Sequence, residues 1–191
     1  MDQHHILKYQ ATYVERLGAA LENRPAAAIA ALVEELSRAE ARRAHVFLIG
    51  NGGSAGNANH LANDLLYGLG PGRGLKADAL SANPSVLTCL ANDLSYERVF
   101  SEQLKVKASA GDVLIALSGS GNSANIVSAL ETGNAMGLKT FAILGYAGGR
   151  CLSVAQTAIH FPVDDMQICE DLQLVVGHLC TQLLRSAEPD R

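Results

Sequence analysis

Four short hydrophobic runs along the chain are separated by longer stretches in which apolar residues recur at helical spacing. The runs cover residues 46–49, 113–117, 140–145 and 158–163, and most are rich in valine, isoleucine and leucine. Runs of this length, apolar throughout, are typical of strands buried on both faces. Strands that alternate with helices predict an α/β fold with a doubly wound, mostly parallel sheet, and ligands that bind at the carboxyl ends of its strands.

Before the first run, apolar residues from about 6 to 40 recur at helical spacing. Pro25 is the only interruption, and Asn23 is a plausible cap before it, so we expect one helix before Arg24 and a second over 25–41. Such alanine-rich helices lie outside an α/β core and need a second surface to cover them. That surface is either another subunit or the protein's own sheet.

The remaining segments are expected to connect or flank the strands. Residues 68–74 hold four glycines and predict a surface loop. Helices are expected from 86 to the Asn92-Asp93 pair, over 96–108, from the second loop to about 136 and over 166–185. His160 lies inside a predicted strand and is expected to be structural.

The first hydrophobic run leads into the turn Gly50-Asn51-Gly52-Gly53-Ser54, which a helical pattern follows. Glycines let backbone N–H groups approach an anion, Ser54 offers a hydroxyl and an N-cap, and the new helix presents its positive end there. His60 and Asp64 stand four residues apart, on one face of that helix. A turn followed by a solvated polar face is an equally good explanation of this loop taken alone.

A second loop of the same kind follows the second run, with the sequence Ser118-Gly119-Ser120-Gly121-Asn122-Ser123. Its hydroxyls and backbone amides can donate hydrogen bonds to phosphate oxygens. A flexible linker is a poor alternative, because this loop directly follows a predicted buried strand and directly precedes a predicted helix. Neither loop ends in Lys-Ser/Thr, and neither has the G-x-G-x-x-G spacing with a later acidic residue. We therefore expect a phosphate ester smaller than a nucleotide.

The predicted last helix carries Glu170 and His178, which are eight residues apart and within about 80° of each other around the axis. Its apolar stripe comprises Ile168, Leu172, Val175, Val176, Leu179 and Leu183. A histidine among such neighbours is more often a satisfied core residue than a catalyst.

The composition of the chain bears on its domain organisation, its partners and its location. The 191 residues are 48% hydrophobic and 18% charged with a net charge of −4, which predicts a single domain over 1–191 with a helical extension at about 1–41. No basic cluster exceeds Arg42-Arg43, which argues against nucleic acid as a partner. With no signal peptide and no apolar run that could span a bilayer, we expect a cytoplasmic protein without membrane contact. The cysteines lack C-x-x-C spacing and are expected to be buried and reduced, namely Cys89, Cys151, Cys169 and Cys180.

The two loops, with Asn92-Asp93 between them and His178 on a late helix, resemble the sugar isomerase (SIS) domain family over roughly residues 17–184. Within that family the resemblance is greatest to the enzymes that convert sedoheptulose 7-phosphate to D-glycero-D-manno-heptose 7-phosphate. The resemblance implies a flavodoxin-like sheet, and N-terminal helices packed between the subunits of a homotetramer. It also implies that the substrate is a small sugar phosphate.

By the same resemblance, Asp64 falls on the position of a catalytic glutamate and His178 on that of a catalytic histidine. The implied substrate-binding residues are Asn51, Gly52, Gly53, Ser54, Asn92, Asp93, Ser118, Gly119, Ser120, Ser123 and Glu170. Some members of the family bind zinc, here through the positions of His60, Asp64, Glu170 and His178. These two imidazoles and two carboxylates suit that ion.

Three departures from the family pattern bear on this expectation. Asp64 is one methylene shorter than the usual glutamate, and Glu170 replaces a usual glutamine. Gly68 takes the place of an active-site arginine, for which Arg73 is a candidate substitute. The expected chemistry is isomerisation through a cis-enediol, with Asp64 as base and His178 as acid. Two alternatives stay open: an isomerase of another ketose phosphate, and a non-catalytic SIS domain that senses sugar phosphates or binds a replication initiator.

Overall fold

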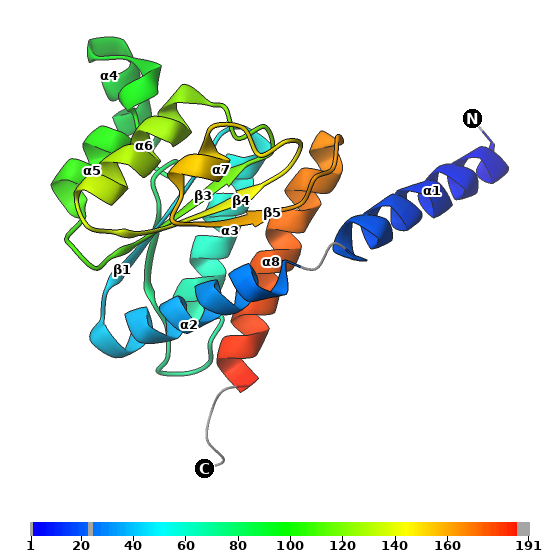
Figure 1. Cartoon of the computed structure of the whole chain (residues 1–191), viewed down its shortest axis with the longest axis horizontal. Helices are drawn as coiled ribbons and strands as arrows, with labels where there is room; N and C mark the ends of the chain where they lie inside the picture. The colour runs from blue at the N-terminus through cyan, green and yellow to red at the C-terminus, as the bar shows by residue number, and fades with distance from the viewer. Residues whose placement is uncertain (1, 23–24, 187–191) are drawn as a thin grey trace.

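The computed structural model describes residues 2–22 and 25–186, which form an α/β fold around a five-stranded sheet (Figure 1). All five strands are parallel, and they lie in the order β2-β1-β3-β4-β5. Their bounds are β1 His45–Gly50, β2 Lys76–Ala79, β3 Val113–Ser118, β4 Lys139–Leu144 and β5 Thr157–His160. This is the flavodoxin-like order, and it confirms the doubly wound sheet predicted from the hydrophobic pattern.

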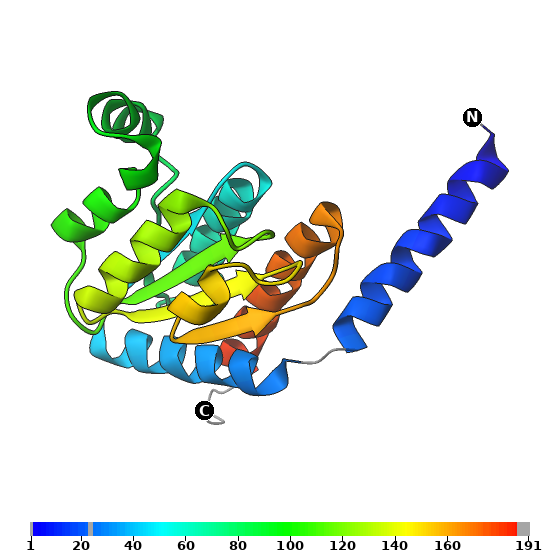
Figure 2. The same cartoon turned by 45° about the horizontal axis from the view of Figure 1, so that its top comes forward.

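Helices cover both faces of the sheet (Figures 1 and 2). One face packs against α2 Ala26–Arg42, α3 Gly53–Tyr67 and α8 Met166–Ser186. The other packs against α5 Ser101–Lys107, α6 Ala124–Ala135 and α7 Cys151–Val154. The 3₁₀ turn η1 Tyr96–Arg98 lies against α6, and α4 Pro84–Asp93 packs on η1.

The residues of β1 show why the central strands read as unbroken apolar runs. Val46 and Leu48 enter the core on the side of α3 and α8, whereas Phe47 and Ile49 enter the core on the side of α5 and α6. All four side chains are fully buried. A strand buried on both faces has no polar side, so its sequence loses the alternation of a half-exposed strand.

The sequence expectation missed or misplaced four elements. The edge strand β2 was missed because its four residues include the exposed Lys76 and Asp78, which leave no apolar run. The helix expected over 96–108 is divided into η1 and α5, and the short α7 was not foreseen. The last strand ends at His160, not at 163, and the ring of His160 contacts the Tyr146 carbonyl at 2.9 Å, as expected for a structural histidine.

The two N-terminal helices differ in how they meet the body of the protein. Helix α2 packs over the sheet and α8, whereas α1, Gln3–Glu22, extends away from the body (Figure 2). Only Ala20 of α1 is buried, and four of its large apolar side chains are exposed, namely Ile6, Leu7, Tyr9 and Val14. The expected cap at Asn23 lies outside the described residues.

The structure also bears on the expected burial of the cysteines and on membrane-spanning helices. Cys151, Cys169 and Cys180 are buried free thiols as expected, but Cys89 is exposed because α4 projects from the fold and buries none of its residues. No helix within the described residues combines the length and hydropathy needed to cross a membrane.

Candidate active site

The two glycine- and serine-rich loops meet at the carboxyl edge of the sheet. Strand β1 pairs with β2 on one side and with β3 on the other, so the loops after β1 and β3 flank the point where the strand order reverses. Between them is an open cavity of about 280 Å³. It is lined by Asn51, Gly52, Gly53, Ser54, Leu117, Ser118, Gly119, Ser120, Ser123, Met166 and Glu170.

In the first loop, the chain turns sharply from β1 into α3. Gly52 has φ +55° and occupies the N-cap position, a left-handed conformation that favours glycine. Ser54 is therefore inside the helix and is not the cap that the sequence suggested. Its hydroxyl is buried and accepts a hydrogen bond from Gln173 Nε2 at 3.0 Å, which leaves its proton free for a ligand.

In the second loop, hydroxyl oxygens accept hydrogen bonds from the loop's own backbone. Ser118 Oγ accepts from Gly121 N at 3.1 Å, and Ser120 Oγ accepts from Asn122 N at 3.3 Å. Ser123 is the N-cap of α6 and its side chain makes no capping bond. These hydroxyls keep their protons available, so the loop can donate to an anion.

The cavity attracts anions without a cationic side chain. Its lining within the described residues contains no lysine or arginine. The amino ends of α3 and α6 both begin there, and their unpaired N–H groups and dipoles favour a negative group. Glu170 opposes them, because its carboxylate lies so close to Gly53 that a Cβ there would overlap both carboxylate oxygens. No hydrogen bond or ion pair of the described residues involves that carboxylate.

A second polar cluster lies further along the same two helices. His60 and Asp64 of α3 meet His178 of α8, and all three are accessible to solvent. The two Nε2 atoms of the histidines are 2.9 Å apart, and Asp64 Oδ2 lies 3.4 Å from the Nε2 of His60 and 3.5 Å from that of His178. We call these three residues the His–Asp–His triad.

The spacing of the triad fits a zinc ion. Ligand atoms around a tetrahedral zinc with bonds of ~2.0–2.1 Å lie about 3.3 Å apart, close to the three distances above. Two imidazoles and one carboxylate also match the ligand types of catalytic zinc sites, which keep a fourth position open. The fourth expected ligand, Glu170, is not part of this group: it is two helical turns before His178 and faces Gly53.

A buried amide network that the sequence reading missed holds α3 against α8. Asn57 Nδ2 donates to the Glu170 carbonyl and to Gln173 Oε1, both at 3.0 Å, and Gln173 in turn binds Ser54. Asn51 of the first loop and Asn125 of α6 exchange two hydrogen bonds of 2.8 and 2.9 Å. The residues that these hydrogen bonds join are far apart in the sequence, so no local sequence pattern predicts the bonds.

The first loop has one further partner, the exposed Tyr96, whose hydroxyl donates to Asn51 Oδ1 at 3.0 Å. Nothing in the sequence marks this tyrosine as part of the site, because 45 residues separate it from Asn51. Its only signal was a position just after Asn92-Asp93.

Three residues expected near the substrate lie elsewhere in this chain. Asn92 and Asp93 are at the exposed end of α4, where Asn92 Nδ2 donates to Asp93 Oδ1 at 2.8 Å, and neither lines the cavity. Asp93 also accepts from Cys89, a hydrogen bond that raises the pKa of that thiol. Arg73 binds Glu40 through Nε and Nη2 at 3.0 and 2.9 Å, so it does not reach the cavity. It lies beyond the carboxyl end of α3, away from the strand ends that form the site.

Comparison with known proteins places this arrangement in a family. A model of the SIS domain matches residues 8–145. A phosphoheptose isomerase from Akkermansia muciniphila is 41% identical over 140 residues, which are 73% of this chain and 74% of that protein. Another, from Chlorobaculum parvum, is 38% identical over 181 residues, covering 91% of this chain and 85% of its own.

Solved structures agree with the sequence comparison. The structure of a phosphoheptose isomerase from Neisseria gonorrhoeae superposes with a TM-score of 0.88 and 26% identity, over 97% of this chain and 99% of its own. The two loops, the strand order and the relatives all indicate the same family. The chain belongs to the SIS domain family and, within it, to the phosphoheptose isomerases.

Proposed function

We propose that this protein isomerises sedoheptulose 7-phosphate to D-glycero-D-manno-heptose 7-phosphate through an enediol. The observation that carries the proposal is a hydroxyl-lined anion cavity and an acid–base triad on the same pair of helices. The names of the relatives support the same activity. They favour it over a non-catalytic SIS domain.

The distance between the two halves of the site suits a long open-chain substrate. Glu170 borders the cavity and His178 belongs to the triad, and eight residues of helix separate them by roughly 12 Å. A seven-carbon chain with a terminal phosphate is about that long. The phosphate would bind Ser118, Ser120 and Ser123 of the second loop, which brings the carbonyl end toward the triad.

In this mechanism Asp64 removes the proton from the carbon next to the carbonyl. His178 Nε2 exchanges a proton with the two oxygens while the proton on carbon moves to the neighbouring position. Asn51 and Ser54 remain candidates to orient the sugar hydroxyls. Glu170 is a candidate to accept hydrogen bonds from those hydroxyls.

His60, Asp64 and His178 would hold zinc, whereas Glu170, the fourth ligand that the resemblance implied, lies against Gly53 outside this group. When bound, the ion supplies Lewis-acid polarisation of the substrate carbonyl. Ligation would occupy a lone pair of Asp64 and the Nε2 lone pair of His178, so the acid–base roles given above belong to the ion-free triad. Metal content and turnover should therefore be measured on the same preparation.

The activity is tested by incubating the protein with sedoheptulose 7-phosphate in D₂O and following the products by NMR. We expect the heptose 7-phosphate to form and solvent deuterium to enter at the carbon that accepts the proton. Asp64→Asn and His178→Asn should each lose about a hundredfold or more of kcat. No product from the wild-type protein, with the fold intact, would refute the proposal.

The phosphate half of the site has its own test. Ser120→Ala with Ser123→Ala should weaken sugar-phosphate binding by about 3–6 kcal/mol, since hydrogen bonds to charged groups contribute about 1.5–3 kcal/mol each. Calorimetry measures this, with Ser153→Ala as a control outside the cavity. Unchanged affinity would remove the serine loop from the proposal.

The metal half is tested by metal analysis and by chelation. We expect about one zinc per chain after reconstitution, and loss of binding in His60→Ala and in His178→Ala. If zinc takes part in turnover, a chelator abolishes activity and added zinc restores it. Full activity of metal-free protein would leave Asp64 and His178 as a metal-independent acid–base pair.

We also infer a homotetramer, located in the cytoplasm, with no nucleic-acid or membrane partner. Two separate sets of exposed apolar side chains support the tetramer, because a tetramer of dihedral symmetry needs two kinds of interface. One set is on α1, and the other is on α3 and α8 and comprises Leu66, Tyr67, Leu179 and Leu183.

A further inference from the structure

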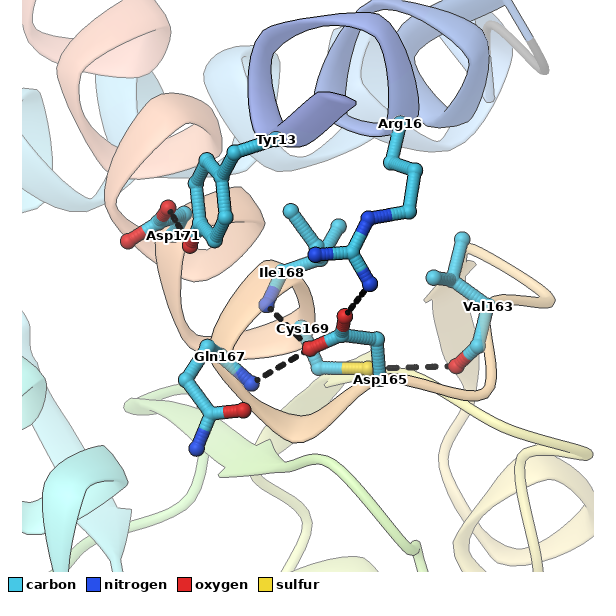
Figure 3. Close-up of polar contacts among 8 residues, drawn as sticks. All are labelled: Tyr13, Arg16, Val163, Asp165, Gln167, Ile168, Cys169 and Asp171. Atoms are coloured by element: carbon cyan, nitrogen blue, oxygen red, sulfur yellow. Dashed lines mark hydrogen bonds and ion pairs between the residues drawn. The ribbon is translucent and has the colours of Figure 1, made fainter. Parts of the chain in front are cut away.

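The first turns of α8 form one wall of the cavity, and α1 binds these turns from the outer side (Figure 3). The Tyr13 hydroxyl donates to Asp171 Oδ2 at 2.6 Å. The Arg16 guanidinium pairs with Asp165 Oδ2 at 2.5 Å and lies over the Tyr13 ring. We call these two contacts the α1–α8 clasp.

Asp165 has two roles at the start of α8. Its Oδ1 accepts hydrogen bonds from the backbone N–H groups of Gln167 and Ile168, which is the geometry of a helix N-cap. Its Oδ2 binds Arg16. The carboxylate is only 15% exposed, so the ion pair is less screened by water than a surface pair.

On the inner side, the same turns pack against the second loop, residues 118–123, which we call the phosphate loop. A Cβ on Gly119 would overlap Met166 Sδ, and one on Gly145 would overlap Cys169 Sγ. Cys169 donates to the Val163 carbonyl at 3.3 Å, and burial raises the pKa of this thiol so that it keeps its proton. The backbone of the phosphate loop and the start of α8 are thus in direct contact, with no side chain on the glycines between them.

We propose that Tyr13 and Arg16 are positioning residues that hold the start of α8 in place, with Met166 against the phosphate loop and Glu170 against Gly53. The inference rests on the proposed function, because it assumes that this cavity binds the substrate phosphate. A helix that lies outside the core therefore sets the affinity of the site. The His–Asp–His triad is further along α8 and makes no contact with the clasp.

The physical reason is preorganisation. A loop already held in its binding conformation costs less entropy to order when the phosphate arrives. The hydrogen bond to Asp171 raises the pKa of Tyr13 to about 12, so its hydroxyl remains a donor at every pH at which the protein would be assayed. Without the clasp, the first turn of α8 is no longer held by α1. The phosphate loop then packs against a helix whose position is less fixed.

Arg16 and Asp165 allow a double-mutant cycle with one variant that keeps the cap. Asp165→Asn retains an equally good N-cap but loses the charge that binds Arg16. We expect Arg16→Ala and Asp165→Asn each to raise KM for sedoheptulose 7-phosphate by about threefold to tenfold, with kcat unchanged. The double variant should be no worse than either single one.

A second readout does not depend on turnover. The dissociation constant for inorganic phosphate, measured by calorimetry on chelator-treated protein, should rise by a similar factor, while zinc affinity stays as in the wild type. Tyr13→Phe should act in the same direction. Tyr9→Phe is its matched control, because Tyr9 is on the same helix with a side chain largely exposed.

Unchanged phosphate affinity in Arg16→Ala, Asp165→Asn and Tyr13→Phe would overturn the inference. Equal losses of phosphate and zinc affinity, or losses that only accompany dissociation seen by sedimentation, would also overturn it, since they indicate a general effect on stability or assembly. A wild-type protein that binds neither phosphate nor the sugar phosphate would instead refute the proposed function itself.

Discussion

Glu170 places a negative charge in a cavity whose other polar groups are hydroxyls and amides. Its carboxylate lies against the amino end of α3, the position that an external anion would otherwise favour. The substrate phosphate is therefore directed to the serine loop. The same charge disfavours any ligand with a second anionic group near the first loop.

Glu170→Gln should tighten binding of inorganic phosphate about tenfold. Two like charges roughly 7 Å apart repel by ~1–2 kcal/mol at the effective dielectric constant of a partly exposed site. Calorimetry on metal-free protein gives the affinity, and Glu131→Gln, which is exposed and outside the cavity, is the matched control. Equal or weaker binding by Glu170→Gln would show that its charge does not face the phosphate.

Cys89 is the one exposed thiol among the four cysteines, all of which are described. We expect iodoacetamide to modify one thiol per folded chain, and to do so slowly at pH 8. The hydrogen bond from Cys89 to Asp93 raises the thiol pKa, which lowers the fraction of reactive thiolate below that of an ordinary cysteine. Asp93→Asn should accelerate the reaction and Cys89→Ser should abolish it, as followed by mass spectrometry. Modification of two or more thiols in the folded protein would contradict the burial of the other three.

At the scale of elements, the pair α3 and α8 carries the whole His–Asp–His triad and one side of the cavity. Their close approach depends on Gly177, because a Cβ there would overlap the Leu61 side chain. Gly177 precedes His178, and Leu61 follows His60. The packing of the two helices thus sets the spacing of the His–Asp–His triad.

Gly177→Ala should destabilise the protein by about 1–3 kcal/mol through overpacking, and it should weaken zinc binding by separating the two histidines. Gly56→Ala on α3 is the control, since no atom within 4 Å would meet the new Cβ. That variant should be stabilised by about 0.5–1 kcal/mol, because alanine favours a helix more than glycine. Urea unfolding and metal titration measure both effects, and a neutral Gly177→Ala would mean that the helices can separate without cost.

At the scale of the whole molecule, α1 is too exposed to be explained by the single chain. It extends from the body with four large apolar side chains in solvent, and it is anchored through the α1–α8 clasp and a few contacts near Ala20 (Figures 1 and 3). Helices of this kind are stable when a second surface covers them.

We therefore expect sedimentation velocity to show an oligomer, most simply a tetramer. Ile6→Glu with Tyr9→Glu should shift the protein toward smaller species, because burying charges in an apolar interface is costly. Val106→Glu is the control, since Val106 is 87% exposed on α5, away from both apolar sets. A wild-type monomer whose sedimentation does not change with concentration would contradict the tetramer.

The sequence by itself determined the sheet and the two loops. Buried parallel strands such as β1 and β3 must be apolar throughout, and tight turns into helices need glycines such as Gly52, so both features leave a local signal. The same local patterns indicated the boundaries of α6 and α8 to within one or two residues. An edge strand such as β2, half in water, leaves no such signal.

Only the tertiary structure decided which distant side chains meet. It brought His60, Asp64 and His178 together, turned Glu170 toward Gly53, and paired Arg73 with Glu40 away from the cavity. It also joined Tyr13 and Arg16 to the start of α8. Most of these contacts join residues more than a hundred positions apart in the sequence, so they depend on how the helices pack and on which neighbour each side chain turns toward. Periodicity fixes which face of a helix a residue occupies, but only the packed fold decides what that face touches.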